Sequence, residues 1–199
     1  MSKRLFDILA SLAGIVVLWP LFALSAFLIW KDDSQGPLLF RQVRVGRDGV
    51  PFEIYKFRTM SVARGGKGSQ VTQASDNRIT RPGRLLRKWK LDELPQLFNV
   101  LKGEMSIVGP RPEVPYFMEK YPAAQRAVIL SMKPGITDLA AIEFRNEEEI
   151  LQRYDNIEKA YIEIIMPIKF GLYEEYSTKS SFLFDLKLIF LTFKNIVLR

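Results

Sequence analysis

Residues 8–30 read ILASLAGIVVLWPLFALSAFLIW, a stretch of 23 residues without a charged side chain. A helix of this length and composition is long enough to cross the hydrocarbon core of a bilayer. Pro20 removes a backbone donor and crowds the preceding turn, so we expect the helix to kink or break between residues 18 and 21. The residues alone leave open a kinked transmembrane helix or a re-entrant hairpin whose two ends stay on the same face of the membrane. A cleaved signal peptide is a weaker alternative, because the apolar stretch is longer than a usual signal core and has a proline at its centre.

Composition limits both the size of the protein and its chemistry. With 199 residues, the chain is expected to hold one folded domain beside the apolar segment. The net charge of +7 indicates an anionic partner, and charge alone leaves open nucleic acid, anionic lipid or a phosphorylated substrate. Cysteine and histidine are absent, which excludes disulfides, thiolate or histidine catalysis and cysteine-ligated metals. Any site is therefore expected to consist of Asp, Glu, Lys and Arg.

The middle of the chain predicts a small β-structure followed by helices. Residues 37–45 and 51–60 read as two strands around the turn GRDG, which is typical of a β-hairpin, and the polar, glycine-rich residues 61–77 predict a mobile loop. Residues 147–166 predict an amphipathic helix that ends before Pro167. In residues 180–199, apolar side chains recur every three or four positions, which fits either a helix lying in a membrane interface or one packed on the core.

Residues 90–112, KLDELPQLFNVLKGEMSIVGPRP, place two adjacent carboxylates ahead of a stiffly held arginine. Asp92 is expected to be the N-cap of a helix that ends at Gly103. As a cap its role would be structural, but an ionised carboxylate at a helix N-terminus also suits binding of Mg²⁺ or attack on phosphorus. Pro110 and Pro112 stiffen the chain around Arg111, whose guanidinium suits phosphate oxygens, although a rigid surface loop explains the same pattern.

Four motifs together resemble the bacterial monotopic phosphoglycosyltransferases, part of the bacterial sugar transferase family. They are YKFRTM (55–60), RITRPGRLLRK (78–88), LDELPQLFNVLKGEMSIVGPRP (91–112) and KPGIT (133–137), and they follow one proline-interrupted apolar segment. These enzymes move a phosphosugar from a UDP-sugar to polyprenyl phosphate. The resemblance covers almost the whole chain and is to the minimal catalytic form, without a large additional N-terminal membrane domain.

The resemblance implies an α+β fold that is mostly α. Residues 1–31 would form a re-entrant membrane helix broken at Pro20. Residues 32–199 would form a compact cytoplasmic catalytic domain with a small β-hairpin and interfacial amphipathic helices, including one at about 180–199. The implied location is the bacterial inner membrane, with the active site on its cytoplasmic face.

The resemblance also implies roles for particular residues. Asp92 would be the nucleophile that expels UMP and carries the phosphosugar covalently, and Glu93 would help it to organise Mg²⁺, the implied cofactor. Phosphate or nucleotide would be held by Lys56, Arg87, Arg111 and Arg145. The acceptor, undecaprenyl or another polyprenyl phosphate, is already an anion, so no histidine base is required. The implied partners are the UDP-sugar, this acceptor and the phospholipid bilayer, without nucleic acid, and a homodimer is allowed.

Three features depart from the usual family pattern. Trp19 precedes Pro20 where many members have serine, DLAAIEFRN (138–146) follows KPGIT in place of a commoner Gly-Trp-Ala-Gln run, and Tyr173 stands where many members have an acidic residue. These departures concern sugar recognition and the helix break rather than the core chemistry. Two alternatives remain: a membrane-tethered basic scaffold that binds anionic lipid or nucleic acid without catalysis, and a glycosyltransferase that releases UDP, for which the expected D-x-D metal motif is missing.

Overall fold

The computed structural model describes residues 3–33, 35–61 and 76–198. These residues form a mostly helical protein with two small two-stranded sheets, so the predicted α+β class is confirmed. Most of the predicted loop 61–77 lies outside the described residues. The elements follow in this order: α1 (Lys3–Asp32), β1 (Leu39–Val45), η1 (Arg47–Gly49), β2 (Pro51–Phe57), α2 (Arg81–Lys88), η2 (Leu91–Glu93), α3 (Gln96–Lys102), β3 (Ser106–Val108), α4 (Pro115–Met118), α5 (Ala123–Ser131), β4 (Gly135–Thr137), α6 (Leu139–Glu143), α7 (Glu147–Leu151), α8 (Ile157–Ala160), η3 (Tyr161–Ile165), α9 (Met166–Lys179) and α10 (Phe182–Val197).

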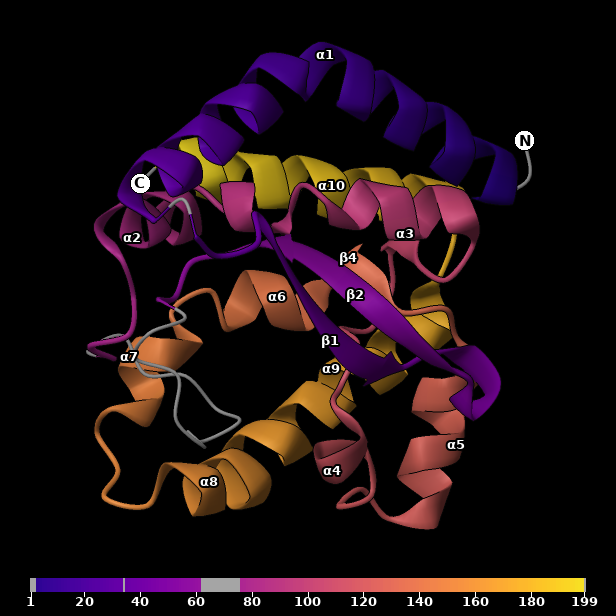
Figure 1. Ribbon diagram of the computed structural model, residues 1–199. Coiled ribbons are helices and arrows are strands. Elements are labelled where there is room, and N and C mark those ends of the chain that lie inside the picture. The colour runs from indigo at the N-terminus through magenta and orange to yellow at the C-terminus, as the bar shows by residue number, and fades with distance from the viewer. Residues whose placement is uncertain (1–2, 34, 62–75, 199) are drawn as a thin grey trace.

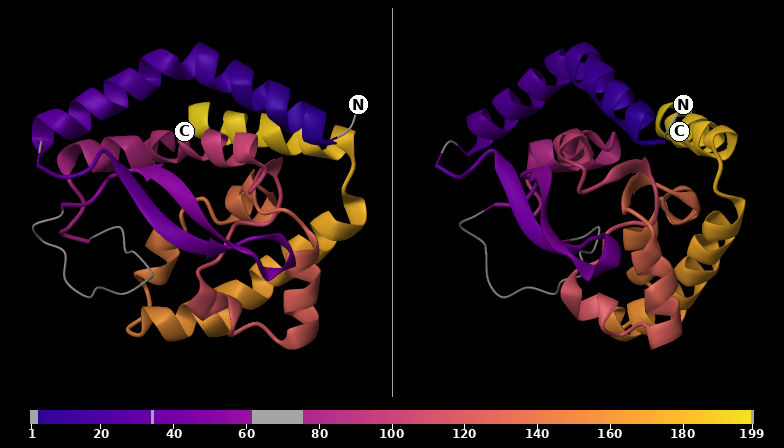
Figure 2. Two further views of the ribbon diagram at one scale, coloured as in Figure 1. Left: turned by 45° about the vertical axis from the view of Figure 1, so that its right-hand side comes forward. Right: turned by 90° about the vertical axis from the view of Figure 1, so that its right-hand side faces the viewer.

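Helix α1 lies along one side of the molecule, with α3 and α10 directly beneath it (Figures 1 and 2). The chain stays helical through Pro20, so the helix is bent rather than broken into two. The bend is expected because the proline cannot donate to the carbonyl four residues earlier and its ring pushes against that turn. It is the one described helix that is long and apolar enough to cross a membrane.

The N-terminal end of α1 is anchored to the domain by charged side chains. Lys3 pairs with Asp185 of α10, and the guanidinium of Arg4 donates to two backbone carbonyls at the end of α3, at 2.5 and 2.8 Å. Asp7 is buried and accepts hydrogen bonds from the Ser106 hydroxyl at 3.1 Å and from the following backbone N–H at 3.0 Å. These contacts hold the start of the apolar helix against the domain.

The other end of α1 is anchored to the same domain. Ile29 is buried with Phe57 of β2 and Leu86 of α2. Just beyond the helix, Asp33 accepts a hydrogen bond from the Arg58 guanidinium at 2.5 Å. Both ends of a 30-residue helix therefore contact one domain.

The predicted β-hairpin is confirmed. Strands β1 and β2 pair antiparallel from Leu39 opposite Phe57 to Val45 opposite Pro51. Asp48 and Gly49 adopt left-handed backbone conformations in the turn, with φ of 57° and 79°. The second sheet, in which β3 and β4 pair in parallel, was not predicted.

The predicted helix over residues 147–166 is wrong in its extent. The segment divides into α7 and α8, and the chain then continues through a π-helical segment, η3, into α9. Pro167 lies in the first turn of α9 instead of ending a helix. Because the helical backbone runs on from α8 through η3 into α9, Pro167 lies within a continuous helical run, where it removes one backbone donor. The π-helical turn directly before it has a shifted hydrogen-bond pattern, which accommodates the proline without ending the helix.

Helix α10 packs on the core, which is one of the two alternatives predicted for it, and its place in a membrane interface stays a prediction. Asp185 and Leu188 are buried against the domain, and Thr192, one turn further, contacts the hydroxyl of Thr137. Its other side chains add to an exposed apolar surface shared with α1. The large exposed apolar residues of the two helices are Leu5, Leu9, Leu12, Val16, Val17, Trp19, Leu24, Phe27 and Trp30 of α1, and Phe182, Leu183, Leu186, Phe190, Phe193 and Val197 of α10.

Two glycines allow the backbone of β3 and its loop to approach β4. A Cβ atom on Gly135 would lie 2.1 Å from the backbone nitrogen of Gly109, and one on Gly109 would lie 2.2 Å from the carbonyl oxygen of Lys133. Because these neighbours are backbone atoms, no side-chain rotation can relieve the clash. This close contact positions the loop that follows β3.

We therefore expect Gly135→Ala to lower the free energy of unfolding by roughly 2–4 kcal/mol, by separating β3 from β4. The measurement is thermal unfolding of the detergent-solubilised protein. Gly171→Ala is the matched control, since a Cβ at this helical position meets nothing within 4 Å and alanine favours the helix. Equal stability of the two variants would contradict the close-contact argument.

Candidate active site

The predicted acidic pair lies in the short turn η2 between two helices. Lys90 adopts a left-handed conformation, with φ of 55°, and turns the chain out of α2. Asp92 and Glu93 follow within η2, and α3 begins only at Gln96. The prediction that Asp92 caps this helix is wrong, because Asp92 lies inside the 3₁₀ turn η2, while the N-cap position of α3 is Pro95 and has no side-chain cap. The predicted end of the helix at Gly103 is confirmed, with φ of 88°.

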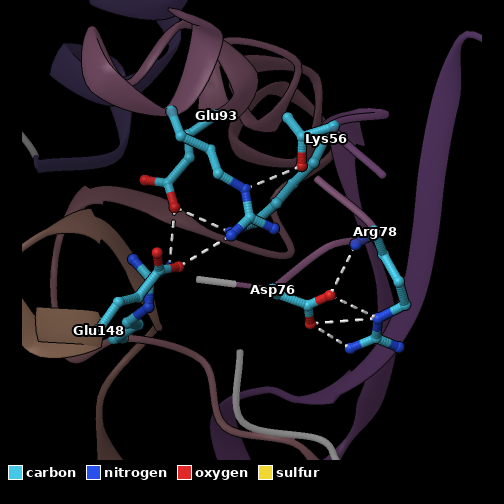
Figure 3. Close-up of polar contacts among 8 residues, drawn as sticks. Lys56, Asp76, Arg78, Glu93 and Glu148 are labelled. Atoms are coloured by element: carbon cyan, nitrogen blue, oxygen red, sulfur yellow. Dashed lines mark hydrogen bonds and ion pairs between the residues drawn. The ribbon is translucent and has the colours of Figure 1, made fainter. Parts of the chain in front are cut away.

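Glu93 is held between two cations. One carboxylate oxygen, Oε1, accepts a hydrogen bond from Lys56 Nζ of β2 and another from Arg111 Nη2, both at 2.8 Å. Figure 3 shows the Glu93 carboxylate within this set of polar contacts. Burial by itself raises the pKa of Glu93, but Arg111, followed by Lys56, outweighs it and holds the pKa well below its usual value. Glu93 is therefore a fixed anion.

Asp92 has a different environment. Its side chain is 8% exposed, and its Oδ1 atom is buried without a hydrogen-bond partner among the described residues. Burial, followed by the neighbouring charge of Glu93, raises the pKa of Asp92. A buried carboxylate oxygen without a partner is costly in a folded protein. Asp92 thus keeps a buried oxygen without a partner among the described residues, whereas Glu93 is held by two cations.

Arg111 reaches Glu93 from the loop after β3. The loop is fixed by its own hydrogen bonds: the Arg111 backbone N–H donates to Asp138 Oδ2 at 2.9 Å, and Arg44 Nη1 donates to the carbonyl of Pro112 at 2.9 Å. The charge of Glu93 raises the pKa of Arg111, which stays protonated. The stiffening expected from the two prolines stays a prediction, whereas the hydrogen bonds show that Arg44 and Asp138 support the loop. Sequence reasoning missed both residues, since neither lies in a motif with Arg111.

Arg87 of α2 and Arg145, from the segment between α6 and α7, belong to the same site. Arg87 donates from Nε to the Thr59 hydroxyl at 3.0 Å and from Nη1 to Glu148 at 2.9 Å. Arg145 lines the cleft that Arg87 lines. In the basic stretch at 78–90, Arg81 is exposed and does not line the cleft, whereas the other basic residues do: Arg78, Arg84, Arg87, Lys88 and Lys90.

The six predicted site residues line one cleft of about 1090 Å³. At its edge, Asp76 and Arg78 form an ion pair with a distance of 2.6 Å, drawn in Figure 3. The cleft is strongly basic and large enough for a nucleotide with an attached group. Its cationic lining residues are Arg41, Arg44, Lys56, Arg58, Arg78, Arg84, Arg87, Lys88, Lys90, Arg111 and Arg145.

The acidic pair offers limited metal coordination. Among the described residues, no group of three or more Asp or Glu side chains could hold a metal ion. The unpartnered Oδ1 of Asp92, beside a second carboxylate, nevertheless fits a hard cation that takes one or two protein carboxylates and completes its coordination with phosphate oxygens and water, as Mg²⁺ does. The donor set fits Mg²⁺ in company with a phosphorylated ligand.

Comparison with known proteins gives a consistent result. The family described as bacterial sugar transferase has a sequence model that matches residues 1–199. The chain is 41% identical over 195 residues to a UDP-glucose:undecaprenyl-phosphate glucose-1-phosphate transferase of Klebsiella pneumoniae, covering 96% of this chain and 39% of that protein. It is 37% identical over 195 residues to the uncharacterized sugar transferase EpsL of Bacillus subtilis, covering 98% of this chain and 87% of that protein.

A third relative extends the range of sugars named among the relatives. It is a UDP-N-acetylgalactosamine-undecaprenyl-phosphate N-acetylgalactosaminephosphotransferase of Aeromonas hydrophila, 48% identical over 145 residues, which cover 70% of this chain and 33% of that protein. The chain thus spans well under half the length of the Klebsiella and Aeromonas relatives.

Asp138 is expected to make the stability of the folded protein depend on pH. Burial raises its pKa from 3.8 to about 6, although the backbone N–H groups of Ala141 and Arg111 donate to it. The folded state then binds the proton more readily than the unfolded state, so the stabilisation from Asp138 falls as pH rises from about 4 to about 6.

We expect Asp138→Ser, which keeps an oxygen for the α6 cap, to remove that decline. The measurement is the midpoint of thermal unfolding against pH, with exposed Asp155→Ser as control; an unchanged slope in Asp138→Ser would contradict the assignment.

Proposed function

Because this chain belongs to the bacterial sugar transferase family, we propose that it is a phosphoglycosyltransferase that moves a phosphosugar from a UDP-sugar to undecaprenyl phosphate and releases UMP. The relatives' names supply the donor and acceptor classes. The observation that carries the proposal is the buried, unpartnered carboxylate of Asp92 inside a large basic cleft. A scaffold that only bound anionic lipid would have no use for this costly arrangement.

In the proposed first step, a carboxylate oxygen of Asp92 attacks the phosphorus that carries the sugar. The bond from this phosphorus to the bridging oxygen of the diphosphate breaks, and UMP leaves with the bonding electrons. In the second step, a phosphate oxygen of the acceptor attacks the same phosphorus and frees the Asp92 carboxylate. The product is a polyprenyl diphosphate sugar, and neither step requires a histidine base.

The surrounding charges make this attack feasible. An anionic nucleophile and an anionic diphosphate repel one another until cations offset the charge. Glu93 holds Lys56 and Arg111 in position, because both donate to the same oxygen. Arg87, fixed by Thr59 and Glu148, adds a third cation on the α2 side. The cationic groups are thus in place before the donor binds.

We further propose that Mg²⁺ is the cofactor and that Asp92 and Glu93 hold it together with the diphosphate of the donor. When bound, Mg²⁺ would neutralise charge on the diphosphate and on the departing UMP. The positions of Lys56 and Arg111 come from the protein itself, whereas the unpartnered Asp92 oxygen is the part of the site that fits a metal ion. Removal of Mg²⁺ is expected to abolish turnover.

We propose that residues 1–31 form a monotopic, re-entrant membrane element at the cytoplasmic face of the bacterial inner membrane, and that residues 32–199 form the catalytic domain. The support is the anchoring of both ends of α1 to one domain through Asp7 and Ile29. A straight 30-residue helix is roughly 45 Å long, more than the hydrocarbon core, so a spanning helix would place its two ends on opposite faces. The exposed apolar side chains of α10 extend the proposed membrane surface.

The chemical proposal is tested by Asp92→Asn. The protein in nanodiscs is incubated with Mg²⁺, undecaprenyl phosphate and a panel of UDP-sugars, and the released nucleotide is identified. We expect UMP from the unmodified protein and a loss of at least 10³-fold in rate for Asp92→Asn, because the amide cannot act as the nucleophile.

The matched control is Asp155→Asn, whose side chain is exposed outside the cleft and which should retain full activity. Intact-mass measurement without acceptor should show a phosphosugar adduct on the unmodified protein and none on Asp92→Asn. Release of UDP would overturn the proposed reaction, and full activity of Asp92→Asn would overturn the covalent mechanism. Binding of undecaprenyl phosphate without turnover of any UDP-sugar would favour the scaffold.

The topology proposal is tested by single-cysteine labelling, which is direct because the chain contains no cysteine. Cysteine is introduced before Met1, at Lys31 and at Arg47, the last in the β1–β2 turn. A membrane-impermeant maleimide should label all three from the cytoplasmic face of the membrane. Labelling after addition of detergent confirms that each cysteine is reactive. Labelling of the N-terminal cysteine only from the opposite face would show a transmembrane helix.

A further inference from the structure

A second cavity of about 310 Å³ lies beside the basic cleft, between α1, α3, α6 and α10. Gly14 and Leu18 contribute from α1, and Thr192, Asn195 and Ile196 contribute from α10. These two helices carry the large exposed apolar side chains described above. The cavity is therefore adjacent to the proposed membrane surface of the protein.

The walls of this cavity are mostly apolar. Leu94 and Leu97 line it from the α3 side, and Ile136 and Ile142 line it from the β4 and α6 side. A cavity so lined suits a hydrocarbon ligand, because its filling removes apolar surface from water.

Charged side chains also line the cavity, among them the ion pair of Lys169 with Glu147. Lys90, Glu93, Arg111 and Arg145 line both this cavity and the basic cleft, so the two spaces meet at the cationic cluster of the site. Tyr173 also lines the apolar cavity; its side chain is fully buried, and its hydroxyl has no hydrogen-bond partner among the described residues. An unsatisfied donor in a cavity that three cations also line is suited to an anionic oxygen.

We propose that this cavity is the acceptor site, an inference that rests on the proposed function. It holds the isoprene units nearest the phosphate of undecaprenyl phosphate, and that phosphate lies at Lys90, Arg111 and Arg145. Its volume accommodates the head of such a ligand, so the remaining chain lies along the apolar surface of α1 and α10. Tyr173 is proposed to donate its hydroxyl hydrogen to the phosphate.

The chemistry of the two steps explains why the spaces meet. Both UMP in the first step and the acceptor in the second step must lie opposite the Asp92 oxygen, in line with the bond that breaks or forms. The acceptor phosphate therefore takes the place vacated by the UMP phosphate, while the nucleoside and the isoprenoid chain extend into different spaces. UMP should accordingly compete with undecaprenyl phosphate for binding, whereas uridine should not.

The test uses Asn195→Trp, which fills the α10 wall of the cavity. Binding of undecaprenyl phosphate is measured without UDP-sugar, in nanodiscs that contain phosphatidylglycerol, so that an anionic phospholipid headgroup is always present as a competitor. We expect at least tenfold weaker binding for Asn195→Trp, with the affinity for UMP unchanged. Undecaprenol and inorganic phosphate should each bind more weakly than the intact acceptor.

Phe193→Trp is the matched control, since Phe193 is on the same helix, is 66% exposed and does not line the cavity. It should bind the acceptor as the unmodified protein does. Ala141→Leu fills the opposite wall, from α6, and should reproduce the selective loss if Asn195→Trp fails to fold. Normal acceptor binding in both filled variants, or an equal loss of UMP binding, would overturn the proposal. Selective loss without UMP release from any UDP-sugar would uphold the cavity assignment and refute the proposed function.

Discussion

The site depends on one buried carboxylate oxygen that accepts hydrogen bonds from two cations. Oε1 of Glu93 binds Lys56 from β2 and Arg111 from the loop after β3, and so joins three segments that are separate in the sequence. Removal of one partner of a buried ion pair typically costs roughly 3–5 kcal/mol, because the other charges remain buried and uncompensated. The neighbouring Asp92 keeps a buried Oδ1 without a hydrogen-bond partner among the described residues, and the proposed function assigns the attack on phosphorus to this carboxylate.

A second constraint fixes the site relative to the apolar helix. Asp7 and Arg4 bind the backbone around α3 and β3, while Ile29 packs beside β2 and α2. The acidic pair lies between these two attachment regions, since η2 connects α2 to the start of α3. A lipid acceptor that entered along α1 would thus reach the cations without leaving apolar surroundings until its phosphate meets Arg111. Such a route requires the apolar cavity and the basic cleft to meet, and the two spaces share the charged lining residues named above.

Further buried polar groups join the segments around the site. Lys169, which is buried, pairs with Glu147 at 2.5 Å, and the Tyr161 hydroxyl donates to Glu113 at 2.6 Å. Asp138 caps α6 and also binds the backbone of Arg111. These contacts join the α9 core to the loop that carries Arg111, so that the arginine is positioned by the fold rather than by its own side-chain flexibility.

Sequence by itself determined the β-hairpin, the apolar helix with its proline, the helix end at Gly103 and the residue types available for chemistry, because these depend on local periodicity, backbone preference and composition. The motifs also identified six residues that prove to line one cleft. Only the tertiary structure decided that Asp92 is an unpartnered carboxylate instead of a helix cap, that Pro167 continues a helix, and that Asp138 and Arg44 support Arg111. The reason is physical: burial, the left-handed turn at Lys90 and ion pairs between distant segments depend on contacts that close only when the chain has folded.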